Sequence, residues 1–121
     1  MGKKILMFED DAFTAELNEY LLADRNYNVQ NRYNVDHVLD DITDFSPDII
    51  LMDLRIPSIG GDKAIEVIKN NDNTKHIPII LYSADVRIEN IANEVSADAC
   101  LKKPFDIDEF VDLIEEKIKP I

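Results

Sequence analysis

The sequence predicts an α/β fold in which five parallel strands alternate with five helices. Short apolar runs, such as the one at 49–52, recur along the chain and suit strands that helices cover on both faces. Between these runs lie segments whose apolar residues repeat with helical spacing, joined by short connections. Such alternation implies right-handed crossovers and a three-layer, flavodoxin-like doubly wound sheet with the strand order 2-1-3-4-5.

The predicted strands end where the apolar runs give way to polar residues. They lie at 5–8, 27–30, 49–52, 79–82 and 99–101. The run at 27–30 is the most polar of the five, which suits a strand at the edge of the sheet.

Each predicted strand is followed by a predicted helix. In the first helix, Phe13, Leu17, Tyr20 and Leu21 recur on one face. Apolar residues with the same spacing mark the later helices within 35–42, 64–68, 88–95 and 107–118. The last helix opens with an acidic variant of the capping box, Asp106 and Glu109, and Pro120 stops it.

Length and composition limit the classes of protein to which the chain can belong. Its 121 residues suit a single domain over 1–121. A net charge of -12 argues against direct nucleic-acid binding, because the acidic excess repels phosphate backbones. No apolar run is long enough for a membrane span and the start does not resemble a signal peptide, so we expect a cytoplasmic chain with no membrane insertion. The single cysteine, Cys100, permits no intramolecular disulfide and no cysteine metal site.

Polar residues collect where the predicted strands end. Glu9 and Asp10 follow the first strand, Asp53 the third, Ser83 the fourth, and Lys103 the fifth. In an open α/β sheet these ends share one edge, where ligands bind. Three carboxylates in one crevice repel each other, so we expect a cation between them to offset the repulsion. Because the set has no histidine or thiol, a hard ion such as Mg²⁺ is favoured.

The same residues suit phosphoryl transfer. An aspartate carboxylate such as that of Asp53 can act as a nucleophile and become an aspartyl phosphate. The reaction requires positive charge around the phosphoryl oxygens, which Mg²⁺ and the Lys103 ammonium would supply, while the Ser83 hydroxyl could donate to a third oxygen.

These motifs resemble those of response-regulator receiver domains of two-component phosphorelay signalling. The resemblance covers essentially the whole chain through segments 4–11, 49–57 with Gly60-Gly61, 83–84 and 103–105. It implies that Asp53 is the phosphoacceptor, with Ser83 as the family's hydroxyl residue and Lys103 as its lysine.

The resemblance also implies the metal ligands. Asp10 would bind Mg²⁺ directly, Glu9 through water, and Arg55 through its backbone carbonyl, together with Asp53. Asp11 is instead expected to cap the first helix. The bond between Lys103 and Pro104 is cis in relatives, and a proline turn that holds a catalytic lysine makes this plausible.

One position departs from the family pattern. Relatives commonly have a tyrosine or phenylalanine three residues before the lysine, and here that residue is Cys100. Tyr82 adjoins Ser83, but alternation along the strand points it to the other face of the sheet. Activation is therefore expected to depend on Ser83 and on backbone movement. Arg55 and Asp85 flank the site, where an ion pair between them would limit the access of water.

We therefore expect a stand-alone receiver domain that is not an enzyme, although it assists its own phosphorylation and dephosphorylation. Its phosphodonor would be a histidine kinase or a histidine phosphotransfer protein. Phosphorylation would change the binding of a downstream effector on the face formed by the fourth strand, fourth helix and fifth strand. The chain would be a monomer or a weak homodimer.

Three alternatives differ in what they require. In a phosphorylation-independent interaction module, Asp53 would not accept a phosphoryl group. A small phosphohydrolase would need a second aspartate at the position of Arg55. A flavin or nucleotide carrier would need a glycine-rich or Ser/Thr-rich loop after the first strand, where the acidic residues 9–11 repel phosphate.

Overall fold

The computed structural model describes residues 2–118, in which strands and helices alternate along the chain. The strands are β1 (Lys4–Phe8), β2 (Asn28–Arg32), β3 (Ile49–Asp53), β4 (Ile79–Ser83) and β5 (Ala99–Lys102). The helices are α1 (Ala12–Ala23), α2 (Val38–Phe45), α3 (Gly61–Lys69), α4 (Ile88–Val95) and α5 (Ile107–Lys117).

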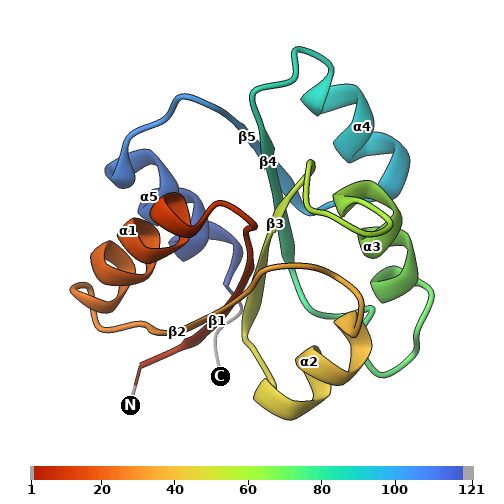
Figure 1. Cartoon of the computed structure of the whole chain (residues 1–121), viewed down its shortest axis with the longest axis horizontal. Coiled ribbons are helices and arrows are strands. Elements are labelled where there is room, and N and C mark those ends of the chain that lie inside the picture. Colours follow the sequence, from red (N-terminus) through yellow and green to blue (C-terminus); the bar gives the residue numbers. More distant parts are fainter. Residues whose placement is uncertain (1, 119–121) are drawn as a thin grey trace.

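The five strands form one parallel sheet in the order β2-β1-β3-β4-β5. Helices α1 and α5 cover one face of this sheet, and α2, α3 and α4 cover the other (Figure 1). The prediction of a doubly wound α/β fold with the strand order 2-1-3-4-5 is confirmed.

Two apolar clusters hold the three layers together, one on each face of the sheet. Every residue of β3 and β4 is buried, as their continuous apolar runs predict, whereas the polar strand β2 lies at the edge. Alternate residues of β4 serve opposite faces: Leu81 packs with α2, α3 and α4, and Tyr82 packs with α1 and α5. No helix within residues 2–118 combines the length and apolar composition needed to cross a bilayer.

Two helices begin at aspartates that cap them, as the sequence predicts. The Asp11 carboxylate accepts a hydrogen bond from the Thr14 amide at 2.9 Å, and Asp106 accepts one from the Glu109 amide at 2.8 Å. Pro120, the expected stop of the last helix, lies outside the described residues.

Helix α1 turns a different face toward the sheet from the one that its large apolar residues mark. Phe13, Leu17 and Tyr20 are 75%, 45% and 71% exposed, whereas Ala15, Asn18 and Leu22 are buried. Both sets have helical spacing, so periodicity alone does not distinguish them. The buried set contains a small residue, which lets the helix approach the sheet closely.

Element boundaries differ from the prediction at two positions. Val35, expected within the second helix, precedes α2 but is still buried, and Tyr27 precedes β2.

The turn between β3 and α3 places the backbone of α3 directly against Asp53. Gly60 has a φ of 86°, which favours glycine, and the Gly61 amide donates to the Leu54 carbonyl at 3.0 Å. A Cβ on Gly61 would overlap the Asp53 carbonyl oxygen and lie 2.8 Å from the Leu54 Cα. This contact is with backbone, so it could be relieved only by moving the end of β3.

We expect Gly61→Ala to lower the free energy of unfolding by roughly 1–3 kcal/mol, because the added methyl group displaces the end of β3. Lys63→Ala, an exposed position on the same helix, should change it by less than about 0.5 kcal/mol. Urea unfolding monitored by circular dichroism measures both, and equal midpoints for the two variants would contradict the close approach at Gly61.

Candidate functional site

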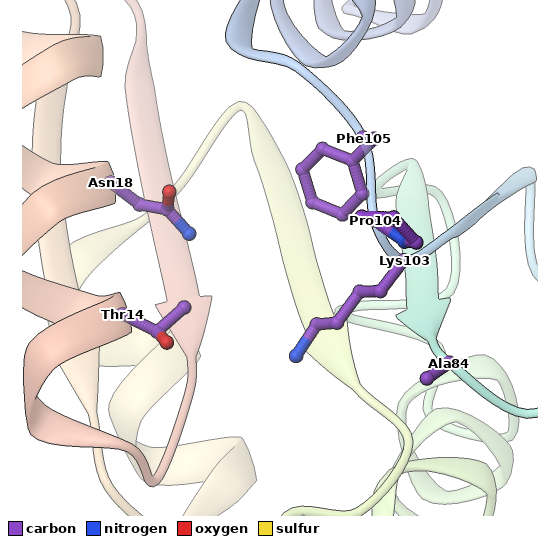
Figure 2. Close-up of a pocket in the computed structure, with 6 residues that line it drawn as sticks. All are labelled: Thr14, Asn18, Ala84, Lys103, Pro104 and Phe105. Carbon is purple, nitrogen blue, oxygen red and sulfur yellow. The ribbon is translucent and has the colours of Figure 1, made fainter.

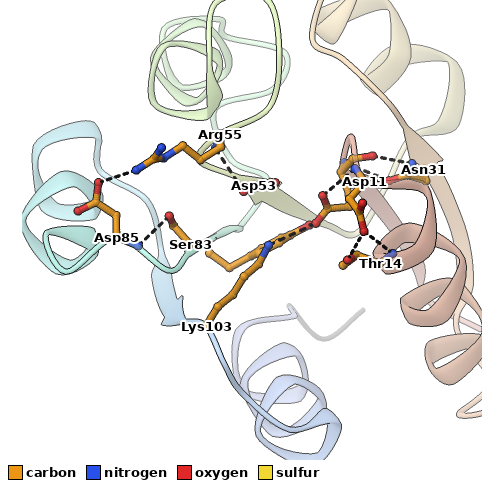
Figure 3. A network of polar contacts seen from close by, with 10 residues as sticks. Asp11, Thr14, Asn31, Asp53, Arg55, Ser83, Asp85 and Lys103 are labelled. Atoms are coloured by element: carbon orange, nitrogen blue, oxygen red, sulfur yellow. Dashed lines mark hydrogen bonds and ion pairs between the residues drawn. The ribbon is translucent and has the colours of Figure 1, made fainter.

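The carboxyl edge of the sheet brings together the polar residues expected there. Asp53 is the last residue of β3, and Ser83 is the last residue of β4. Glu9 and Asp10 directly follow β1, and Lys103 directly follows β5. Figure 3 shows Asp53, Ser83 and Lys103 converging between the strand ends.

Three carboxylates at this edge form a group that could hold a metal ion. One oxygen from each of Glu9, Asp10 and Asp53 lies within 4.8 Å of the others. Glu9 and Asp53 are buried, and Asp10 is exposed. A donor set of carboxylate oxygens that is partly open to solvent suits Mg²⁺, which retains several waters when bound.

Asp53 lies in an environment that disfavours its charge. Burial and the negative charge of Glu9 raise the pKa of Asp53 to about 6, and the Lys103 ammonium and the Arg55 amide offset part of this effect. The Arg55 amide donates to Asp53 Oδ1 at 3.2 Å. Above this pH the chain without a metal ion therefore holds two adjacent buried negative charges.

Contacts of the Lys103 backbone fix its position, and its side chain extends toward the carboxylates. Its amide donates to the Ser83 carbonyl at 2.8 Å, and its peptide bond to Pro104 is cis, as expected. The Lys103 ammonium nitrogen Nζ lies 3.6 Å from Glu9 Oε1 and 5.0 Å from the centroid of the Tyr82 ring.

A hollow of about 350 Å³ opens over Asp53. It is lined by Asp53, Arg55, Ser83, Ala84, Asp85 and Lys103. The Ser83 side chain is buried, and its Oγ accepts a hydrogen bond from the Asp85 amide at 3.1 Å. A group bound to Asp53 in this hollow would therefore be enclosed by a cation and a hydroxyl.

A second hollow, of about 440 Å³, lies on the other side of Lys103 (Figure 2). Thr14 and Asn18 project into it from α1, opposite Lys103, Pro104 and Phe105 on the segment that follows β5. Lys103 thus lines both hollows and is accessible from two sides.

At the rim of the site the expected ion pair between Arg55 and Asp85 is present, with 3.5 Å between the nearest atoms. Arg87, which the sequence analysis did not consider, binds the same carboxylate at 2.8 Å and 3.1 Å. Hydrogen bonds from Arg87 lower the pKa of Asp85 well below its ordinary value. Arg87 lies only two residues after Asp85 in the sequence, and this short spacing could have predicted the contact.

Tyr82 is the second residue at the site that the sequence analysis missed. It points to the face opposite Cys100, as alternation predicted, and its hydroxyl lies next to Glu9. The Tyr82 hydroxyl donates to Glu9 Oε1 at 3.1 Å. Burial, followed by the nearby carboxylates, raises the pKa of Tyr82 well above its ordinary value. The available signal was that a buried tyrosine usually finds a partner for its hydroxyl.

We predict that Asp53→Asn stabilises the chain in the presence of a chelator, by an amount that grows with pH. The folded chain keeps the Asp53 proton up to about pH 6, whereas an unfolded chain releases it near 3.8, so the wild type loses stability as the pH rises between these values. The melting temperature of Asp53→Asn relative to wild type should rise by roughly 3–6 °C between pH 4 and pH 7.5. Asp72 has a side chain that is 92% exposed, so the difference in melting temperature between Asp72→Asn and the wild type should not change with pH. The same constancy for Asp53→Asn would contradict the raised pKa of Asp53.

Comparison with proteins of known family bears on this arrangement. The family model of the response regulator receiver domain matches residues 5–115. The polar-differentiation response regulator DivK of Brucella anthropi is 26% identical over 117 residues, which cover 95% of each chain. The response regulator ArlR of Staphylococcus aureus is 34% identical over 110 residues, which cover 89% of this chain and 49% of ArlR. This chain thus spans about half the length of ArlR.

Solved structures agree with the family match. The receiver domain of the sensor histidine kinase PA1611 from Pseudomonas aeruginosa, with a magnesium ion coordinated in its active-site cleft, has a TM-score of 0.89 at 25% identity, covering 98% of each chain. The BeF3-activated N-terminal receiver domain of Klebsiella pneumoniae RstA has a TM-score of 0.89 at 19% identity, covering 98% of this chain and 100% of that one, a likeness of fold alone. With its strand order, its acidic edge and the family match over residues 5–115, this chain belongs to the response regulator receiver domains of two-component signalling.

Proposed function

We propose that this receiver domain accepts a phosphoryl group on Asp53 from a phosphohistidine of a histidine kinase or a histidine phosphotransfer protein. The observation that carries the proposal is the placement of Asp53. Its carboxylate is buried beneath a hollow of about 350 Å³ whose walls include Lys103 and Ser83. A carboxylate so placed is shielded from bulk water but open to a group that enters the hollow.

Glu9, Asp10 and Asp53 would hold Mg²⁺ together with the backbone carbonyl of Arg55. The cluster of carboxylate oxygens supports this proposal, as does the magnesium ion in the cleft of the PA1611 receiver domain. The Arg55 side chain points away from Asp53 toward Asp85 (Figure 3), whereas its backbone amide donates to Asp53. When bound, Mg²⁺ would supply positive charge to a phosphoryl oxygen and to the Asp53 carboxylate.

The chain's own residues account for the rest of the transfer. A carboxylate oxygen of Asp53 forms a bond to phosphorus while the bond from phosphorus to the donor's imidazole nitrogen breaks. The electron pair stays on that nitrogen. Lys103 moves from Glu9 to a phosphoryl oxygen, and the Ser83 hydroxyl donates to another. The domain assists its own phosphorylation and dephosphorylation but is not an enzyme acting on a separate substrate.

Ser83 is the residue through which phosphorylation would be transmitted. Its hydroxyl can donate to a phosphoryl oxygen and still accept from the Asp85 amide, so the loop after β4 would follow the movement of Ser83. Cys100 replaces the usual aromatic residue and packs near the apolar core on the α4 side. A backbone shift of β4, α4 and β5 would therefore change the surface that a downstream effector binds.

The proposed place of action is the cytoplasm, as a monomer or weak homodimer. The main alternative is an interaction module that works without phosphorylation, which Cys100 keeps open. It differs from the receiver function in one measurable respect, the modification of Asp53.

The purified domain is expected to gain one phosphoryl group from acetyl phosphate in the presence of Mg²⁺, seen as a mass increase by mass spectrometry. Chelation of Mg²⁺ or the change Asp53→Ala should abolish the increase, because the first removes the offsetting charge and the second removes the nucleophile. Asp72→Asn, at an exposed position away from the site, should be modified like the wild type. No adduct on a wild-type domain that binds Mg²⁺ would favour the interaction module.

Removing the rim ion pair should shorten the lifetime of the phosphorylated domain. Arg55 and Asp85 line the hollow over Asp53, so Arg55→Ala or Asp85→Ala would open it to the attacking water. We expect hydrolysis to become roughly 2–5 times faster, because an ion pair at the rim whose Arg55 side chain is exposed contributes about 1 kcal/mol or less. Loss of the adduct with time, followed by mass spectrometry, measures this rate, and unchanged rates in both variants would exclude a role for the pair.

A further inference from the structure

Glu9, Asp53 and Tyr82 form a row across three neighbouring strands. Asp53 is paired in register with Tyr82 between β3 and β4. The pairing of Phe8 with Met52 between β1 and β3 places the next residues, Glu9 and Asp53, side by side. The row runs along the carboxyl edge of the sheet, with the phosphorylatable aspartate in the middle.

The Tyr82 hydroxyl reaches past Asp53 to the far end of this row, where it donates to Glu9 Oε1 at 3.1 Å. Tyr82 is fully buried. The rings of Phe105 and Phe110 pack nearly edge-on against its ring, with centroids 6.2 Å and 6.0 Å away. The hydroxyl is therefore held by a rigid aromatic group, unlike the flexible ammonium of Lys103.

Glu9 is surrounded by donors of three kinds: a backbone amide, a hydroxyl and an ammonium group. Oε2 accepts from the Asp11 amide at 3.1 Å, and Oε1 contacts both the Tyr82 hydroxyl and Lys103 Nζ, the latter at 3.6 Å. Glu9 is only 1% exposed, so water cannot readily replace a partner that leaves. A buried carboxylate that loses its partners is strongly destabilised.

Lys103 cannot serve Glu9 and a phosphoryl group equally well. Its ammonium contacts Glu9 here, and it also lines the hollow over Asp53. If Lys103 were the main donor to Glu9, a phosphoryl oxygen would have to compete with Glu9 for it. The Tyr82 hydroxyl weakens that competition because it stays on Glu9 whichever way Lys103 turns.

We propose that Tyr82 is a positioning residue that keeps Glu9 hydrogen-bonded and so releases Lys103 to bind the phosphoryl group on Asp53. This role rests on the proposed receiver function and deepens it. Tyr82 acts through Glu9 and Lys103 and does not itself contact the phosphoryl group.

The test measures binding of beryllium fluoride, a phosphoryl analogue, to the Mg²⁺-loaded domain by isothermal titration calorimetry. Tyr82→Phe keeps the ring and removes only the hydroxyl. We expect it to weaken beryllium fluoride binding about tenfold, as the loss of a hydrogen bond to a buried charge implies, and to leave binding of Mg²⁺ alone within about threefold. Tyr20→Phe, which removes the same atom from a side chain on the α1 surface, should bind like the wild type.

Measuring Tyr82→Phe in a Glu9→Gln variant distinguishes a positioning role of Tyr82 from a general effect on the stability of the fold. In Glu9→Gln the buried charge is gone and Lys103 has no carboxylate to leave, so Tyr82→Phe should have almost no further effect on beryllium fluoride binding. An equal loss in both backgrounds, or no loss in the wild-type background, would overturn the role of Tyr82 while leaving the receiver function intact. Failure of the wild type to bind beryllium fluoride with Mg²⁺ would overturn the proposed function and this inference together.

Discussion

Two carboxylates of like charge, Glu9 and Asp53, lie buried side by side at the carboxyl edge of the sheet, and the surrounding groups offset their repulsion. Lys103 contacts Glu9 at 3.6 Å, the Arg55 amide donates to Asp53, and the Tyr82 hydroxyl donates to Glu9. Even so, burial together with the negative charge of Glu9 keeps the pKa of Asp53 raised, at about 6. A cation at this edge would therefore offset the remaining repulsion between the two carboxylates, which the surrounding groups of the chain only reduce.

The sheet holds the Glu9 and Asp53 carboxylates close together despite their repulsion, because it fixes the backbone on which they lie. Strands β1 and β3 are interior strands of the sheet, and β3 is buried along its whole length. The backbone of Glu9 is tied to the edge strand by Asn31, whose side chain accepts from the Glu9 amide and donates to its carbonyl, both at 3.1 Å (Figure 3). The two carboxylates therefore cannot move apart readily.

The sequence was sufficient to predict the fold and to place the strand-end residues together. The period of the apolar runs determines which segments are strands, and a parallel arrangement then brings Asp53, Ser83 and Lys103 to one edge. The face that α1 buries could not be predicted, because two sets of residues share its period. The contact between Tyr82 and Glu9 was also missed, since it joins residues from strands that are not adjacent and depends on how far a tyrosine reaches across β3.

The outward stripe of α1, formed by Phe13, Leu17 and Tyr20, also affects how copies of the domain behave in solution. Exposed apolar side chains attract one another, whereas a net charge of -12 drives the copies apart. Salt screens the second effect and leaves the first largely intact. The ionic strength of the medium therefore shifts the balance between dispersed and self-associated copies.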